Sequence, residues 1–297
     1  MTDRLLGSGL IIVDKPAGMT SHDVISRLRR IFRTRRVGHA GTLDPMATGV
    51  LVVGIERGTR FLAHLVTETK TYRATIRLGA STTTDDAEGD ITSRTDTTDV
   101  TDTLIDAAIA QLTGDIMQKP AAVSAIKIDG KRAHERVRDG ETVDIPARPV
   151  TVHRFDVLDR RSVDGYIDLD VDVFCSSGTY IRSLARDLGN ALGVGGHLTA
   201  LRRTTVGPFD LTHARTLEEL EDNPQLSLTL DQALAASFPI LRVSGEEGHK
   251  LAMGQWLEPR GLKGIHAAVT PDGQAVALVK EKGKRLATVF VARPSTL

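Results

Sequence analysis

A single carboxylate, Asp44, stands in residues 38–51, GHAGTLDPMATGVL, a segment in which glycine and proline restrict the backbone. Pro45 disfavours the helical region for Asp44 and pushes it toward extended geometry, and Gly41 and Gly49 permit positive φ angles nearby. The apolar run that follows is typical of a buried strand. An acid on a stiff loop beside such a strand can serve as a nucleophile or a proton-transfer group. The alternative for Asp44 is an ordinary Asp-Pro turn.

Three further segments combine charged or aromatic residues with turn formers. They are VDKPAGMTS at residues 13–21, KTYR at 70–73 with LGASTTTD at 78–85, and CSSGTYIR at 175–182 with DLG at 187–189. Together with residues 38–51, these segments resemble the motifs of TruB-type pseudouridine synthases, in the order of that family, from about Gly9 to Thr205.

The resemblance implies an isomerisation, in bacterial members at uridine 55 of the tRNA T-loop. The C1′–N1 glycosidic bond breaks, the uracil turns, and C1′ joins C5, with no redox change, no cofactor and no metal. By resemblance Asp44 is the catalytic carboxylate, and the atom that it attacks stays open. Arg182 matches an arginine that pairs with this aspartate and would keep it ionised and oriented. Tyr72 matches a tyrosine that stacks on the base and relays the proton. From the residues alone, Arg182 could be an exposed helix arginine and Tyr72 a core tyrosine.

The same resemblance assigns substrate-binding residues. A uridine inside a folded loop must be flipped out before reaction. This step costs roughly a few kcal/mol, which other contacts with the RNA offset. His39 matches a histidine that holds the tRNA loop after base extrusion, or it is a structural histidine in a turn. Tyr180 is expected to pack against the bound base. Lys15 either braces the Asp44 loop or contacts an RNA phosphate.

Charge is unevenly spread along the chain. The totals of 38 Lys and Arg and 38 Asp and Glu cancel, so net charge indicates no polyanionic partner. A dense arginine cluster nevertheless precedes His39: Arg27, Arg29, Arg30, Arg33, Arg35 and Arg36. A local basic stripe can hold phosphates whatever the net charge, and Arg29, Arg30 and Arg33 are our candidate RNA contacts. The alternative is a solvated helix face.

The composition and the hydrophobic runs limit the class of protein. The one cysteine, Cys175, excludes an internal disulfide and an all-cysteine metal site, and fits a reducing compartment. No signal peptide is visible at the N-terminus, and no apolar run approaches the ~18–20 residues of a membrane span. We therefore expect a soluble, cytoplasmic protein without membrane contact.

Hydrophobic periodicity predicts an α+β fold with a mixed, mostly antiparallel central sheet flanked by helices and loops. Residues 9–13, 72–78 and 167–173 have strand patterns, the last with a solvated face of aspartates. Helices are predicted after Thr20, over residues 104–112 and from Ile181. We expect a catalytic domain at residues 1–240, with a basic RNA-binding insertion at about 117–149. Residues 241–297 predict a small β-rich domain that resembles, by its position, the PUA-type RNA-binding domain of the family.

Some segments depart from the family pattern or have an alternative explanation. Ala121, Val123 and His134 replace a proline and two tyrosines that are more usual in the insertion. His134-Glu135 lacks the second histidine of a zinc-protease helix. The acidic run at 85–90 lacks EF-hand spacing and predicts a solvated loop. Residues 90–103, rich in Thr and Asp, are expected to form a surface loop.

The leading hypothesis is a stand-alone tRNA pseudouridine synthase that acts on the T-arm and needs no obligate protein partner. An alternative from another class is an RNA-binding or tRNA-folding factor in which catalysis is secondary. A third is the same chemistry on another RNA. The joint presence of Asp44, Tyr72 and Arg182 argues against a purely binding role.

Overall fold

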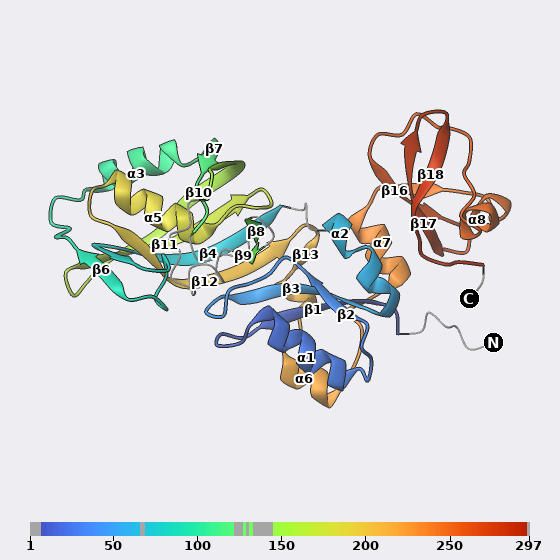
Figure 1. The fold of residues 1–297 in the computed structure, drawn as a ribbon, viewed down its shortest axis with the longest axis horizontal. Coiled ribbons are helices and arrows are strands. Elements are labelled where there is room, and N and C mark those ends of the chain that lie inside the picture. Colours follow the sequence, from blue (N-terminus) through green and yellow to red (C-terminus); the bar gives the residue numbers. More distant parts are fainter. Residues whose placement is uncertain (1–6, 66–68, 122–126, 129–130, 133–144, 296–297) are drawn as a thin grey trace. The chain divides into compact units, whose positions relative to one another are not determined.

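The computed structural model describes residues 7–65, 69–121, 127–128, 131–132 and 145–295 (Figure 1). The chain forms two compact units. The first comprises residues 1–45, 49–67 and 205–297, and the second comprises residues 46–48 and 68–204. Among the described residues, no helix is both long enough and apolar enough to cross a membrane.

Two buried strands form the centre of the first unit. Strand β1 (Gly9–Lys15) pairs antiparallel with β3 (Thr48–Ile55), and nearly every residue of both is buried. Strand β14 (Leu228–Thr229) pairs with β1, and β2 (Val37–Ala40) pairs with β3. Both faces of this strand pair are covered, which explains why each strand has a continuous apolar run in the sequence.

Helix α1 (Ser21–Ile31) follows β1 and begins as the sequence predicts. The Thr20 side chain accepts from the backbone of Asp23, whose carboxylate accepts in return from the Thr20 backbone, forming a capping box. Val24, Ile25 and Leu28 are buried, which is the periodicity of an amphipathic helix. The helix packs against α6 (Leu217–Asp222).

The C-terminal part of the first unit is a small β-rich module, as predicted. Strand β15 (Ile240–Arg242) lies parallel to β16 (Ile265–Val269), which continues antiparallel into β17 (Ala275–Lys282) and β18 (Arg285–Val291). Helix α8 (Gly245–Ala252) begins at a Ser244–Glu247 capping box and packs on β17 and β18.

Short elements connect this module to the buried strands. They are η1 (Glu56–Arg60), α2 (Leu62–Leu65), β13 (Phe209–Asp210), η2 (Leu211–His213) and α7 (Leu230–Ser237). A single hydrophobic core runs through them, because side chains of β1, β3, α2 and α7 pack in one cluster with side chains of β16, β17 and β18. The division at residue 240 stays a prediction.

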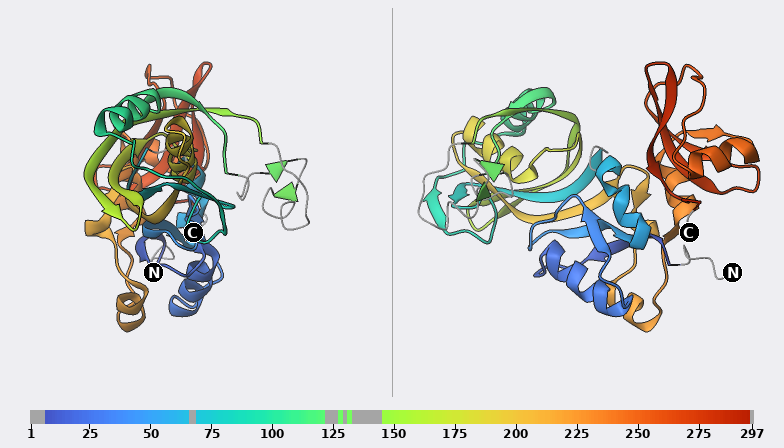
Figure 2. Two further views of the ribbon diagram at one scale, coloured as in Figure 1. Left: turned by 90° about the vertical axis from the view of Figure 1, so that its left-hand side faces the viewer. Right: turned by 45° about the vertical axis from the view of Figure 1, so that its right-hand side comes forward.

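The second unit is built on a sheet whose strands follow the order β12-β4-β11-β10-β7. These strands are β12 (Gly196–Val206), β4 (Lys70–Leu78), β11 (Tyr166–Cys175), β10 (Arg148–Val163) and β7 (Gly114–Gln118). Helices α3 (Asp102–Gln111) and α5 (Ile181–Ala191) pack against each other on the same face of the sheet (Figures 1 and 2). The predicted α+β fold with a mostly antiparallel sheet is confirmed.

Two small hairpins complete the second unit. Strand β5 (Ala80–Thr82) pairs with β6 (Ile91–Arg94), and β8 (Lys127–Ile128) pairs with β9 (Lys131–Arg132). The loop predicted at residues 90–103 is therefore wrong in part, because it contains β6 and the start of α3. Of the predicted insertion at 117–149, its first two residues belong to β7 and its last two to β10, and most of the remainder lies outside the described residues.

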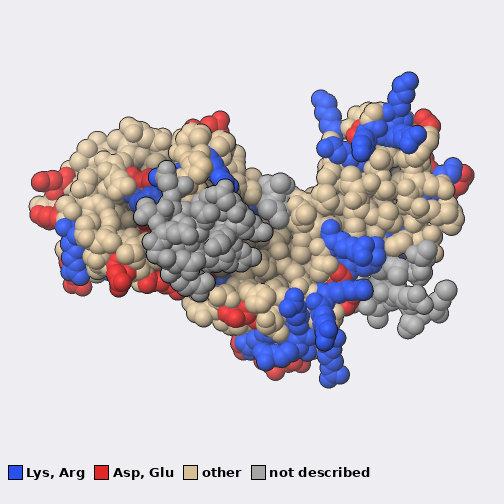
Figure 3. Space-filling model, viewed as in Figure 1, with Lys and Arg blue, Asp and Glu red and all other residues tan. Residues whose placement is uncertain are grey.

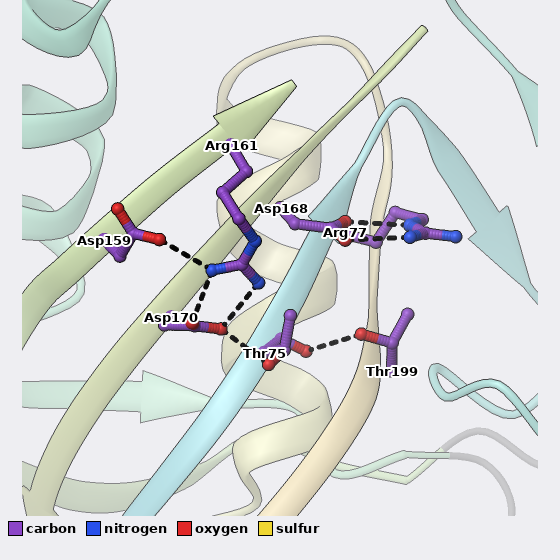
Figure 4. Close-up of polar contacts among 7 residues, drawn as sticks. All are labelled: Thr75, Arg77, Asp159, Arg161, Asp168, Asp170 and Thr199. Atoms are coloured by element: carbon purple, nitrogen blue, oxygen red, sulfur yellow. Dashed lines mark hydrogen bonds and ion pairs between the residues drawn. The ribbon is translucent and has the colours of Figure 1, made fainter. Parts of the chain in front are cut away.

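The aspartates of β11 are paired with arginines, and one of them is buried. Arg77 donates two hydrogen bonds of 2.8 Å to Asp168, whose side chain is only 8% exposed. Asp170 accepts from Arg161 at 2.5 Å and from Thr75 at 2.7 Å (Figure 4). The hydrogen bond from Arg161 holds the pKa of Asp170 below its usual range. The predicted solvated face is wrong at Asp168, whereas the side chain of Asp170 is 37% exposed. Strand alternation specifies a polar face but not what lies across it.

Candidate active site

The peptide groups on both sides of Asp44 are fixed by hydrogen bonds within the first unit. The hydroxyl of Ser21 accepts from Leu43 N at 2.9 Å and donates to Leu43 O at 3.1 Å. The carbonyl of Pro45 accepts from Gly18 N at 2.9 Å and from Lys15 Nζ at 3.2 Å. Asp44 itself is half-buried. A carboxylate between two clamped peptides is held in place before any ligand arrives.

Lys15 is a buried part of this clamp. It is 0% exposed, and its ammonium also donates to Pro16 O at 2.7 Å and Met19 O at 2.6 Å. A buried charge is tolerated only with such compensation. This position favours the bracing role over the phosphate contact that the sequence left open. Sequence reasoning gave no role to Ser21 or Gly18, although both belong to the segment 13–21 that it singled out.

Arg182 lies in the first turn of α5 and is only 5% exposed. Its Nη1 donates to the carbonyl of Thr84 at 3.1 Å and lies 3.7 Å from Oδ2 of Asp86, which is 2% exposed. The alternative of an exposed helix arginine is therefore wrong. Two opposite charges removed from water attract strongly and orient each other.

The loop that carries Asp86 is ordered by its own side chains. Oδ1 of Asp86 accepts from the Thr84 hydroxyl at 2.5 Å and from Glu88 N at 3.0 Å, and its carbonyl accepts from the Thr82 hydroxyl at 2.7 Å. The prediction of a solvated acidic loop is wrong at Asp86. The signal that could have found it is the adjoining segment 78–85, since a loop between motif residues is a poor candidate for bulk solvent.

A second pair ties the same loop to α5. Arg186 Nη1 lies 3.1 Å from Asp85 Oδ2, and Arg186 also donates to Lys119 O at 2.6 Å. Burial raises the pKa of Asp85, and the nearby Arg186 opposes this effect. The helix that carries Arg182 thus holds the acidic loop at two points.

Tyr72 and Tyr180 occupy different settings in the second unit. Tyr72 is 7% exposed and lies opposite Val173 of β11, on the buried face of β4 with Ala74. This burial fits both a core tyrosine and a ring that a flipped base would cover. Tyr180 caps α5 and is half-buried, and the Gln118 side chain binds its backbone with bonds of 2.8 Å and 3.1 Å.

His39 and the arginine cluster belong to the first unit. His39 is half-buried in β2, opposite Val53. Arg29 and Arg30 are exposed in the last turn of α1, and Arg33 is exposed just beyond it. Arg27 differs from them, because it pairs with Glu218 at 3.0 Å and with Glu221 at 2.7 Å on α6. Arg36 also lies 3.5 Å from Glu56, so two members of the cluster pair with acids of the protein.

The departures from the family pattern are only partly visible. Ala121 is 0% exposed, whereas Val123 and His134 lie outside the described residues. Among the residues that the structure describes, no cluster of three or more His, Cys, Asp or Glu is arranged to hold a metal ion.

Comparison with protein-family models gives three matches that divide the chain. Residues 29–181 match the N-terminal domain of the TruB family pseudouridylate synthases. Residues 182–236 match a C-terminal domain model of tRNA pseudouridylate synthase B, and residues 238–293 match the C-terminal model of tRNA pseudouridine synthase II.

Curated relatives match along the whole chain. The tRNA pseudouridine synthase B of Corynebacterium efficiens is 73% identical over 297 residues, which is 100% of both chains. The protein of the same name from Nocardia farcinica is 60% identical over 289 residues, covering 97% of this chain and 94% of the other.

Solved structures agree in fold and in family. A Cbf5-Nop10-Gar1 complex contains a chain with a TM-score of 0.74 and 27% identity, covering 98% of this chain and 87% of that one. An H/ACA RNP bound to a substrate RNA containing 2′-deoxyuridine gives a TM-score of 0.72 and 26% identity, covering 96% of this chain and 85% of that one. From these matches and the site residues described above, the chain belongs to the TruB family of pseudouridine synthases, which are isomerases.

Proposed function

We propose that this protein isomerises uridine 55 in the T-loop of tRNA to pseudouridine, without a cofactor and without an obligate protein partner. The observation that carries the proposal is the 73% identity, along the full length of both chains, to the tRNA pseudouridine synthase B of Corynebacterium efficiens. The clamped Asp44 loop and the buried Arg182 support it, because the reaction needs an ionised and oriented carboxylate.

In the proposed reaction Asp44 acts as the nucleophile and Arg182 as its charge partner. Attack of the Asp44 carboxylate on the substrate accompanies cleavage of the C1′–N1 bond. The uracil then reattaches to C1′ through C5, and the bond to Asp44 breaks, which restores the carboxylate. The proton then leaves C5 and N1 gains one, so the net change is an isomerisation. Tyr72 stacks on the base and relays the C5 proton. Thr84 and Asp86 support this role of Arg182, because both contact the same guanidinium nitrogen, Nη1, and so restrict its position.

The target uridine must leave its stack before Asp44 can reach it. We assign the compensation for this step to packing of the base against Tyr72 and Tyr180 and to His39, which would hold the T-loop after base extrusion. Phosphate contacts come from Arg29, Arg30 and Arg33, which are exposed around the end of α1. Residues 117–149 would close on the RNA, and residues 241–297 would act as a PUA-like RNA-binding domain.

The test is pseudouridine formation on an unmodified tRNA transcript, with the modified position mapped. We expect product at uridine 55 in the wild-type protein and none in Asp44→Asn. The variant should keep measurable tRNA affinity, because only one carboxylate oxygen is replaced by an NH2 group. Asp90→Asn is the matched control, since Asp90 is an exposed acid.

Three outcomes would contradict parts of the proposal. Tight tRNA binding by a folded wild-type protein that makes no product would support the binding-factor alternative. Modification only at another site or in another RNA would replace the substrate. Loss of both turnover and tRNA affinity in Asp44→Asn would make Asp44 a structural residue.

A further inference from the structure

Positive charge is concentrated in the C-terminal module. Residues 238–293 contain nine Lys and Arg against five Asp and Glu, whereas the whole chain contains 38 of each kind. In Figure 3, Lys and Arg side chains project from the surface of the part that contains β16, β17 and β18. A module with this excess attracts a polyanion although the chain as a whole is neutral.

The hairpin between β17 and β18 presents part of this charge. Lys282, Lys284 and Arg285 are exposed and, among the described residues, form no ion pair with an acid. The neighbouring acid, Glu281, accepts hydrogen bonds from Arg260 N at 2.7 Å and Leu262 N at 3.3 Å. Its carboxylate is therefore engaged by backbone groups and not by an ion pair with these three cations.

An aromatic ring lies beside these cations. Trp256 is 44% exposed, and the guanidinium carbon of Arg285 lies 4.8 Å from the centroid of its ring. The backbone explains this proximity, because Leu257 and Leu286 exchange hydrogen bonds of 3.0 Å and 2.8 Å. The residues that precede each of them, Trp256 and Arg285, are thereby brought together.

The surface next to Trp256 is hollowed. The ring belongs to residues 255–260, which line a hollow of about 530 Å³ together with Glu247 and Lys250. A large, partly exposed aromatic ring at a hollow that contains polar groups is typical of a recognition surface. Trp256 is also the only tryptophan of the chain.

A flat ring with a stacked guanidinium and nearby lysines suits one kind of partner. Every nucleobase has a face that stacks on an aromatic or guanidinium plane, and the adjoining phosphates bind cations. Base pairs in a duplex hide these faces in the stack, so the partner must offer an unpaired nucleotide. Arg285 lies over the ring, and Lys282 is its partner across the β17–β18 hairpin, so the cations beside this aromatic surface favour a polyanion.

We propose that Trp256 and Arg285, with Lys282 and Lys284, form a second RNA-binding site that stacks an unpaired nucleotide of the substrate tRNA outside the T-arm. This proposal rests on the proposed function for the identity of the RNA. The site increases affinity for the whole tRNA and takes no part in the chemical step at Asp44.

The first experiment uses the emission of Trp256, which reports this site alone. A short, unstructured single-stranded RNA is titrated into the wild-type protein. Stacking should quench the emission in a saturable way, and added salt should weaken the binding because phosphate contacts release counterions. A double-stranded RNA of the same length should quench less at equal concentration. Absence of saturable quenching overturns the proposal.

The second experiment compares variants on full-length tRNA and on an isolated T-arm hairpin. Trp256→Ala should weaken the affinity for full-length tRNA about 5- to 150-fold, the range that ~1–3 kcal/mol per stacked base implies. The affinity for the hairpin should stay unchanged, and Trp256→Phe should restore most of the loss. Arg285→Ala should also weaken the affinity for full-length tRNA. This variant retains Trp256, so its binding can still be followed by fluorescence.

Controls separate this inference from the proposed function. Arg154→Ala removes an exposed cation from the other compact unit and should leave both affinities unchanged. Each variant should form pseudouridine at the wild-type single-turnover rate at saturating enzyme. If the wild-type protein forms no pseudouridine, the proposed function is wrong. The quenching experiment still tests whether Trp256 binds unpaired RNA. Unchanged tRNA affinity in both Trp256→Ala and Arg285→Ala overturns the second site. An altered oligomeric state of these variants, with tRNA affinity unchanged, also overturns it.

Discussion

At the scale of single residues, burial has given two charged side chains roles that their residue types do not announce. Lys15 is 0% exposed and Asp86 is 2% exposed. The first directs its ammonium at backbone carbonyls around the Asp44 loop, and the second faces the guanidinium of Arg182. Each charge is compensated in part by a group distant in sequence, Pro45 for Lys15 and Arg182 for Asp86, which is why each depends on the folded chain.

Asp86→Asn should slow the reaction more than it weakens tRNA binding. The amide keeps the size of the side chain but removes the charge that faces Arg182, so the guanidinium loses part of its orientation. Misplacement of a catalytic partner by about 1 Å can cost about 10²-fold in rate, and we expect a loss up to that size in the single-turnover rate. Asp90→Asn serves as the control. Equal loss of rate and affinity would contradict a positioning role.

The stability of the protein should fall at alkaline pH through Cys175. Burial raises the pKa of this thiol from 9.0 to about 11. Between these values the unfolded chain releases the proton while the native protein retains it, so the free energy of unfolding decreases as pH rises. Urea unfolding below pH 9 and near pH 11 should show a smaller decrease in Cys175→Ala. The same decrease in both proteins would exclude the thiol as its source.

At the scale of elements, the Asp44 loop depends on the turn that connects β1 to α1. Ser21, in the first turn of α1, binds both backbone groups of Leu43, and Gly18 and Lys15 bind the carbonyl of Pro45. The capping box at Thr20 fixes where α1 begins, and so it also fixes where the Ser21 hydroxyl lies. A loop without regular structure is thereby held as firmly as the elements beside it.

Lys15→Met tests whether this lysine braces the loop or binds RNA. Pro16 and Met19 lose the donor to their carbonyls, whereas the carbonyl of Pro45 keeps its bond from Gly18 N. An unsatisfied buried polar group costs about 1–3 kcal/mol, so the free energy of unfolding should fall by about 2 kcal/mol or more. The dependence of tRNA affinity on salt should keep its slope. Arg30→Ala is the comparison, and loss of a phosphate contact there should reduce the slope by about 0.7–0.9. A reduced slope in Lys15→Met would favour the phosphate contact.

At the scale of the whole molecule, the C-terminal module shares a core with the buried strands of its own compact unit. Phe290 of β18 lies 6.0 Å from the ring of Phe61, and the guanidinium of Arg57 lies 5.8 Å from the Phe290 ring. Arg57 also donates to the carbonyls of Val291 and Ala292. A small β module can unfold independently of the rest of a chain, but a core shared with the buried strands makes the unfolding of the two parts cooperative.

Phe290→Ala should uncouple the module. Truncation of a buried phenylalanine costs about 3–5 kcal/mol, and Phe290 is 8% exposed. In the wild-type protein, unfolding followed by Trp256 emission and by circular dichroism should coincide. In the variant, the emission of Trp256 should change at lower denaturant. Coincident curves with an unchanged midpoint would show that the two parts are not coupled through this ring.

The sequence by itself determined the elements and the family. Local signals were sufficient for the helix after Thr20, the alternation along β4, and the buried run of β1, because each depends on neighbours within a few residues. The motifs around Asp44, Tyr72 and Arg182 were sufficient for the family, and their catalytic roles stay proposals.

Only the tertiary structure decided which charges are buried and what they face. The acidic run at residues 85–90 and the aspartates of β11 have the pattern of solvated segments, yet Asp86 faces Arg182 and Asp168 is covered by Arg77. Sequence periodicity records which side of an element is polar, whereas burial depends on residues that are 91 to 98 positions away. A charge leaves water only when such a distant partner compensates it, and that partner is set by the fold.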